Sequence, residues 1–324
     1  MTEPPEAAPT GKSSDIPAET QPEREPLNPF EAFRARTLIP WMILGGVLLL
    51  ASVYLVSLFT PLDPGDPATG RVVRMLSLYG ALLAWIVWAC RRAGVDLRRL
   101  VGRIPAGHSW WTTLGLLAVT MVFSIGSGAI FIYGLAVAAP GVLEFLLDTV
   151  EPNPPLAYQV VVPVVAVGLA PAIEELLFRG VLLNRWALKW SVARAVVATS
   201  LAFGILHANP VGVTVVGLVM AVLYLRTGTL LVPFAFHAAN NLVARILRFM
   251  MGPPEPMDVA ARIQAIRDTG PGLWGLGMVA VTLPVLVWYL RRNWPSRGAR
   301  IPYLTDYRVA KTRVNCGNSV NSVL

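Results

Sequence analysis

Apolar segments long enough to cross a lipid bilayer constrain this chain more than any other feature. A spanning helix needs about 17–25 mostly apolar residues, whereas a spanning strand needs only about 9–11. The sequence contains eight candidate helical spans, at residues 38–59, 75–90, 110–139, 156–183, 192–207, 211–225, 230–250 and 272–290. Only 14% of its residues are charged, against about 25% in a typical soluble domain. We therefore expect an all-α, polytopic membrane helix bundle with about eight transmembrane helices.

The basic residues are distributed unevenly between the two ends of these spans. If the N-terminus is cytoplasmic, 21 of the 27 Lys and Arg residues fall on the cytoplasmic side and six on the other. This positive-inside pattern predicts that both termini are cytoplasmic. Arg outnumbers Lys by 24 to 3, a habit of GC-rich bacterial genomes, so we expect a bacterial plasma membrane. The basic residues flank spans and form no single stripe, so the lipid bilayer is an expected partner and nucleic acid is not.

The chain is predicted to divide into one membrane domain and two tails. Residues 1–37 are polar and rich in Pro and Glu, which indicates a disordered cytoplasmic tail. Residues 38–292 form the predicted eight-helix membrane domain, and residues 293–324 form a cytoplasmic C-terminal tail.

Three short patterns place ionisable or polar residues inside the apolar segments. They are Glu174-Glu175 followed by Arg179, Phe203 followed by His207, and His237 followed by Asn241. A carboxylate or guanidinium at the bilayer centre costs about 2.5–3.5 kcal/mol on insertion scales, so such residues indicate a functional site.

The spacing within the first pattern assigns different roles to its two glutamates. Pro171 is expected to break or kink the helix, and if a new helix begins there, both glutamates lie in or just past its first turn. Glu175 and Arg179 are four residues apart and can pair on one face. Glu174 points about 100° away and is free to act on another group.

His207 is predicted to lie at the same depth as Glu174. A turn at Trp190-Ser191 would join two spans as an antiparallel pair, with Glu174 16 residues before Trp190 and His207 16 residues after Ser191. At about 1.5 Å per residue, both side chains would lie about 24 Å from the turn.

Two kinds of chemistry fit these residues. Glu174 and His207 can hold a water and take its proton, while His237 and Asn241 stabilise the oxyanion that forms on an attacked carbonyl. Alternatively, Glu174, His207 and His237 can bind a divalent metal such as zinc and leave one position for water. The zinc-protease pattern H-E-x-x-H is absent, and no Ser or Cys lies in a nucleophile motif near the histidines.

The three patterns together resemble the CPBP family of intramembrane proteases, which includes CAAX prenyl endopeptidases and bacteriocin-immunity (Abi) proteins. The resemblance covers a catalytic core at about residues 156–250. It implies a bundle of about eight membrane helices and an intramembrane endopeptidase acting on a membrane-associated protein or peptide substrate. It further implies that Glu174 and His207 activate water, and that His237 and Asn241 stabilise the oxyanion. The family is labelled a metalloprotease family, but a metal-free glutamate mechanism is also argued for its members.

Two other functions use the same residues. A non-catalytic membrane scaffold or bacteriocin-immunity-type protein would retain them for stability. A proton-coupled transporter would use buried Glu and His as a relay, but the paired broken helices of inverted repeats are not evident in the sequence.

Overall fold

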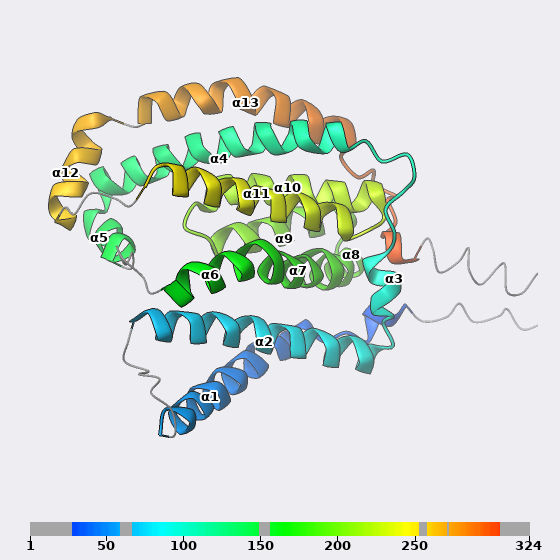
Figure 1. The fold of residues 1–324 in the computed structure, drawn as a ribbon. Helices are drawn as coiled ribbons and strands as arrows, with labels where there is room; N and C mark the ends of the chain where they lie inside the picture. Colours follow the sequence, from blue (N-terminus) through cyan, green and yellow to red (C-terminus); the bar gives the residue numbers. More distant parts are fainter. Residues whose placement is uncertain (1–27, 59–66, 149–155, 253–257, 271, 305–324) are drawn as a thin grey trace, which may run out of the picture.

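The chain folds into a bundle of helices (Figure 1). The structure, a computed structural model, describes residues 28–58, 67–148, 156–252, 258–270 and 272–304. Every regular element in these residues is helical, which confirms the predicted all-α class.

The helices follow the apolar segments of the sequence. Those before the first motif are α1 (Leu38–Ser57), α2 (Pro67–Ala93), α3 (Leu97–Val101), α4 (Trp110–Ala138) and α5 (Pro140–Asp148). The motif-bearing part contains α6 (Leu156–Val164), α7 (Ala170–Glu175), α8 (Asn184–Lys189), α9 (Val192–Ile205), α10 (Pro210–Thr227) and α11 (Leu231–Met250). The last two are α12 (Val259–Thr269) and α13 (Gly272–Asn293).

Six helical stretches of the described chain are long and apolar enough to cross a membrane. They are Ala35–Leu55, Val72–Ala93, Trp110–Ala138, Val160–Lys189, Pro210–Thr227 and Gly272–Asn293. The other two predicted spans are helical but weaker: α9 has only 14 residues, and α11 carries several polar side chains. The protein is thus an integral membrane helix bundle, and eight is an approximate count of its spans.

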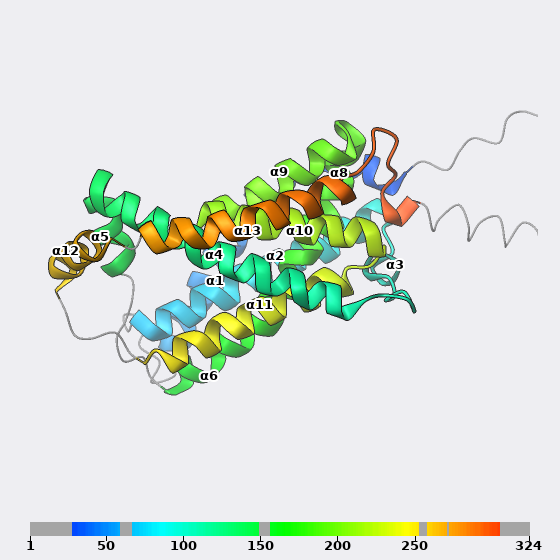
Figure 2. The ribbon, with the colours of Figure 1, turned by 90° about the horizontal axis from the view of Figure 1, so that it is seen from above.

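Helix α10 lies at the centre of the bundle. Its residues Val219, Met220, Ala221 and Val222 point in successive directions, and all are fully buried. Helices α4 and α13 run side by side along one face, and α1 and α2 lie on the opposite face (Figures 1 and 2). The motif-bearing helices α7, α9 and α11 lie between these two layers, so the site is enclosed by the bundle.

Glycines allow α4 and α13 to approach closely. A Cβ on Gly126 would lie 2.7 Å from Met278 Cβ and 2.8 Å from the Gly275 carbonyl oxygen. Small residues at such contacts are the usual means of packing helices within lipid.

Parts of both predicted tails belong to the folded core. Phe30 is fully buried, and its ring meets that of Tyr303 edge-on at 5.2 Å between centroids. Phe33 packs edge-on against Trp85 of α2 at 5.5 Å. Residues 28–37, which the sequence assigns to a disordered tail, are therefore part of the folded structure, because Phe30 and Phe33 bury their rings in the core. Residues 1–27 and 305–324 lie outside the described parts. The described ends of the chain meet at one end of the bundle (Figure 1).

Candidate active site

The first motif lies on a continuous helical segment, Val160–Lys189. Two stretches of it, Val165–Leu169 and Leu176–Leu183, are π-helix, and α7 with both glutamates lies between them. The predicted break at Pro171 is therefore wrong. The π-turn before α7 and the position of Pro171 in its first turn accommodate the proline without ending the helix.

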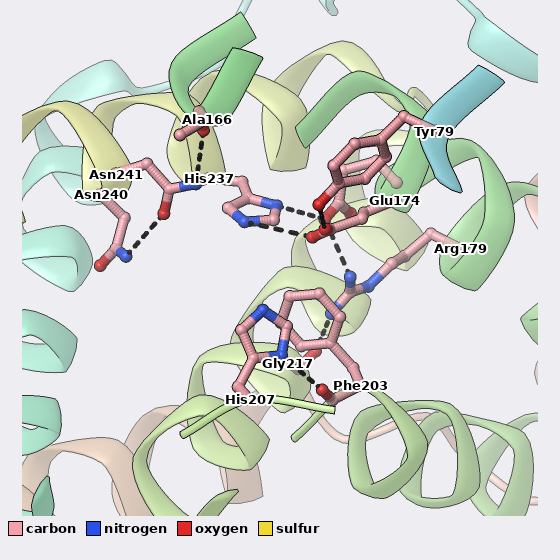
Figure 3. A network of polar contacts seen from close by, with 11 residues as sticks. Tyr79, Ala166, Glu174, Arg179, Phe203, His207, Gly217, His237, Asn240 and Asn241 are labelled. Carbon is pink, nitrogen blue, oxygen red and sulfur yellow. Dashed lines mark hydrogen bonds and ion pairs between the residues drawn. The ribbon is translucent and has the colours of Figure 1, made fainter. Parts of the chain in front are cut away.

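Asn241 of α11 replaces the hydrogen bond that Pro171 cannot make. In the π register each N–H bonds the carbonyl five residues earlier, as Ala170 does with Val165. The next bond would run from residue 171 to Ala166, but proline has no N–H. The Asn241 side-chain amide donates to the Ala166 carbonyl instead, at 2.8 Å (Figure 3). The third motif is thereby fixed to the helix of the first.

Asn184 has a comparable role where the second π-stretch ends. Its fully buried amide nitrogen donates to the carbonyl oxygens of Gly180 at 2.6 Å and Arg179 at 3.1 Å. The Tyr224 hydroxyl of α10 lies 3.1 Å from the same nitrogen. Asn184 therefore satisfies carbonyls at the change of helix type and fixes the backbone that bears Arg179.

Glu175 and Arg179 form the predicted ion pair. Arg179 Nη1 donates to Glu175 Oε1 at 2.8 Å, and both side chains are completely buried. Arg179 Nη2 also donates to the Gly217 carbonyl of α10 at 3.0 Å. A Cβ on Gly217 would lie 3.4 Å from this nitrogen and 3.2 Å from Ser200, so glycine permits the close approach of the three helices. The pair thus joins the first motif to the central helix.

Phe203 is the contact point between the motifs. The Arg179 guanidinium carbon lies 4.7 Å from the centre of its ring, a cation–π distance. The rings of His207 and His237 lie 4.6 Å and 5.5 Å from it, measured between centroids. Phe203 is therefore a shared packing surface for the cation and both histidines.

His237 of α11 bridges the two glutamates. Its Nδ1 lies 3.1 Å from Glu175 Oε1, and its Nε2 lies 3.7 Å from Glu174 Oε2 (Figure 3). Because Glu175 is already paired with Arg179 and accepts hydrogen bonds, Nδ1 carries the ring proton. The other ring nitrogen, Nε2, faces Glu174.

Glu174 has a second partner that none of the motifs contains. The Tyr79 hydroxyl of α2 donates to Glu174 Oε1 at 2.6 Å. This helix precedes the motif-bearing segment by a large sequence separation, and a tyrosine in an apolar span carries no signal of its own. The Glu174 side chain is 13% exposed, while Glu175 is fully buried. Of the two carboxylates, Glu174 is the accessible one.

His207 follows the C-terminal end of α9, with its ring against Phe203. Its Nδ1 lies 2.7 Å from the Phe203 carbonyl oxygen, which can only accept, so Nδ1 carries the proton. The predicted turn at Trp190-Ser191 is present between α8 and α9. Within the described residues, however, no hydrogen bond or ion pair joins His207 to Glu174; the histidine that lies next to Glu174 is His237.

The three residues proposed as metal ligands are not gathered around one point. In the parts of the chain that the structure describes, no group of three His, Cys, Asp or Glu side chains has the arrangement of a metal site. Glu174 and His237 adjoin one another, but His207 makes its contacts with Phe203. These positions do not fit a three-ligand zinc site, and zinc binding by Glu174, His207 and His237 stays a prediction.

A comparison with known protein families finds a match to the region that contains this site. Residues 156–243 match the family model described as type II CAAX prenyl endopeptidase Rce1-like. All three motifs fall within the match, so the resemblance to CPBP-type proteases is confirmed over these residues. No curated protein and no solved structure matches the chain. The match supports a membrane endopeptidase of the CAAX-protease type, acting on a membrane-associated peptide.

Proposed function

We propose that this protein hydrolyses peptide bonds within the membrane and that Glu174 is the general base. The observation that carries the proposal is the position of the Glu174 carboxylate. Tyr79 holds one of its oxygens at 2.6 Å, and the other lies 3.7 Å from His237 Nε2. A polar pair separated by more than about 3.5 Å is a place for a bridging water.

The proposed reaction begins with that water. Its oxygen attacks the carbonyl carbon of the peptide bond, and Glu174 takes one of its protons. The C–N bond of the resulting tetrahedral intermediate then breaks, and the protonated Glu174 gives its proton to the departing nitrogen. The products are a carboxylic acid and an amine, and Glu174 returns to its ionised form.

His207 is then available to bind the carbonyl oxygen of the substrate. Because the Nδ1 proton of His207 is engaged by a backbone carbonyl, only Nε2 can face a ligand. In its protonated form, Nε2–H donates to the carbonyl oxygen as it becomes negative. The N–H of Asn241 not used by Ala166 can add a second donor. This proposal assigns the water to His237 instead of His207, because His237 is the histidine in contact with Glu174.

Glu175 and Arg179 are positioning residues in this scheme. Glu175 accepts a hydrogen bond from Nδ1–H of His237 and so fixes the ring orientation that turns Nε2 toward Glu174. Arg179 neutralises Glu175, because an unpaired carboxylate would be costly in this buried position.

Neither a metal nor a prenyl group on the substrate is needed for these steps. Zinc at Glu174, His207 and His237 is a separate prediction. Elemental analysis of active protein before and after chelation tests it, since stoichiometric metal lost together with activity supports the ligand set.

The experiment for the proposed function uses full-length protein reconstituted in liposomes with a library of membrane peptides. Wild type should release new peptides, and Glu174→Gln should release none while eluting and unfolding like wild type. Glu144→Gln, which changes an exposed carboxylate on α5, is the matched control and should cleave normally. Equal cleavage by Glu174→Gln contradicts the proposal, and absence of cleavage by wild type favours the scaffold or immunity-type alternative.

A further inference from the structure

A basic cavity of about 900 Å³ lies away from the candidate active site, at the end of the bundle where the described chain ends meet. Residues 31–37 form one wall, and the C-terminal end of α2 and the short helix α8 form the others. Figure 2 places the blue segment before α1 beside α8, and contacts between them agree. The charge pattern predicts that this end faces the cytoplasm.

The cavity has a large excess of positive charge. Five basic side chains and one carboxylate, Glu31, line it, which gives a formal charge of 5 − 1 = +4. The basic residues are Arg34, Arg36, Arg92, Arg185 and Lys189. Among the described residues none of the five forms an ion pair with a carboxylate. Mutual repulsion of these charges favours an anion between them.

Helix ends account for only part of this charge. Cations suit the partial negative charge at a helix C-terminus, as Arg92 provides for α2 and Lys189 for α8. Arg185 lies in the first turn of α8 and has no such role, and Arg34 lies outside the α-helices altogether. The cavity thus holds more cations than the helix ends require.

An apolar groove continues from the cavity along the outer face of α2. Gly80, Leu83, Ala84 and Val87 line its apolar part, Arg91 lies at its basic end, and it shares both Trp88 and Arg92 with the basic cavity. From residue 80 to residue 92 the helix rises by about 18 Å at 1.5 Å per residue. This length is close to half of the roughly 30 Å hydrocarbon core, which is one leaflet.

Aromatic side chains mark the junction between cavity and groove. The ring of Trp88 stacks on that of Trp41 at 5.2 Å between centroids, and the Arg92 guanidinium carbon lies 5.6 Å from the Trp88 ring centre. Tryptophan is enriched at the level of lipid headgroups, and arginine there binds phosphate well. The junction is therefore at headgroup depth.

We propose that this cavity and groove form a binding site for an anionic phospholipid. The phosphodiester lies among the five cations, and one acyl chain follows the groove along α2. Basic pockets between membrane helices bind lipid headgroups on this principle. A free phosphate would use the cavity alone, whereas the adjoining groove fits a ligand that also has a hydrocarbon chain. The proposal does not depend on proteolysis, because the site uses none of the residues assigned to the reaction.

Native mass spectrometry of the full-length protein in detergent tests the binding. The probes are phosphatidylglycerol and phosphatidylcholine with the same long acyl chains. Phosphatidylglycerol should be retained as a bound molecule and phosphatidylcholine should not. The variant Arg92→Gln/Arg185→Gln/Lys189→Gln should lower the affinity for phosphatidylglycerol on the order of 100-fold, since each basic residue near a lipid surface contributes about one kcal/mol.

Two further variants separate a built site from general attraction. Arg98→Gln/Arg103→Gln/Arg297→Gln removes the same number of charges, all of them exposed and outside the cavity, and should bind like wild type. Ala84→Trp fills the groove and should weaken long-chain phosphatidylglycerol but leave the dihexanoyl form unaffected. Any one of four results overturns the proposal. Two are an equal loss of phosphatidylglycerol affinity in the matched charge variant and equal retention of phosphatidylcholine by wild type. The other two are no retention of phosphatidylglycerol and full competition by inorganic phosphate.

Discussion

Removing Arg179 tests the buried ion pair, because the effect of the substitution on stability can be measured separately from its effect on activity. In Arg179→Met, the fully buried Glu175 carboxylate loses the guanidinium that pairs with it. Breaking a buried pair in this way costs roughly 3–5 kcal/mol of unfolding free energy. The Gly217 carbonyl also loses its hydrogen bond from the charged guanidinium, which accounts for about 1.5–3 kcal/mol of that cost.

A second variant distinguishes the charge from the packing. In Glu175→Gln/Arg179→Met no charge is left unpaired, so the double variant should regain about 2 kcal/mol of unfolding free energy relative to Arg179→Met. The amide oxygen that Glu175→Gln introduces still accepts from His237 Nδ1, but a neutral acceptor is about half as strong as a carboxylate. Loss of about one kcal/mol in orienting His237 corresponds to roughly a fivefold fall in kcat.

The assay is reversible unfolding in mixed micelles, followed by tryptophan fluorescence, together with peptide cleavage in liposomes. The expected pattern is an unstable single variant and a double variant that is more stable but slow. If the double variant is no more stable than Arg179→Met, the pair does not act through charge. If the double variant is stable and fully active, Glu175 does not position His237.

Three other changes test separate parts of the account. Tyr79→Phe removes the hydrogen bond to Glu174 and should lower kcat by about 10- to 100-fold, as a bond to a charged group is worth about 1.5–3 kcal/mol; unchanged kcat in a cleavage assay would show that Tyr79 is not needed. His207→Ala should lower kcat by about 10²–10³-fold, while His207→Gln, which keeps a donor, should retain more activity; equal loss in both variants contradicts the oxyanion role. Gly126→Val should lower the unfolding free energy by about 1–3 kcal/mol by separating α4 from α13, with kcat retained in the folded fraction; unaltered stability would contradict the close helix contact.

Local spacing was sufficient to predict some of these features. The pairing of Glu175 with Arg179 follows from their separation by one helical turn, and the turn at Trp190-Ser191 follows from polar residues between two apolar runs. The all-α class follows from segment length, because no other regular structure spans lipid at that length without an unsatisfied backbone.

Long-range contacts account for most of what the sequence did not reveal. Pro171 was interpreted as a helix break because the sequence does not show that Asn241 satisfies the Ala166 carbonyl. Nothing in the apolar composition distinguishes a π-helix from an α-helix. The sequence does not identify Tyr79 as a site residue for a similar reason, since its role depends on how α2 packs beside α7.

Which histidine contacts Glu174 also depends on how the helices pack. Equal depth on neighbouring helices predicted His207, but depth along a helix does not fix the direction in which a side chain points. The packing of α11 against α7 brings His237 to Glu174 instead. Phe203 lies against both rings and contacts each of them.

The most direct measurement is the single-turnover rate of one cleaved peptide with purified Glu174→Gln, compared with wild type in the same liposomes. Gln has the same shape as Glu and still accepts the Tyr79 hydrogen bond, but it cannot take a proton from water. The account predicts a rate at least about 10²–10⁴-fold lower with the fold intact. A rate equal to that of wild type would mean that another group activates the water.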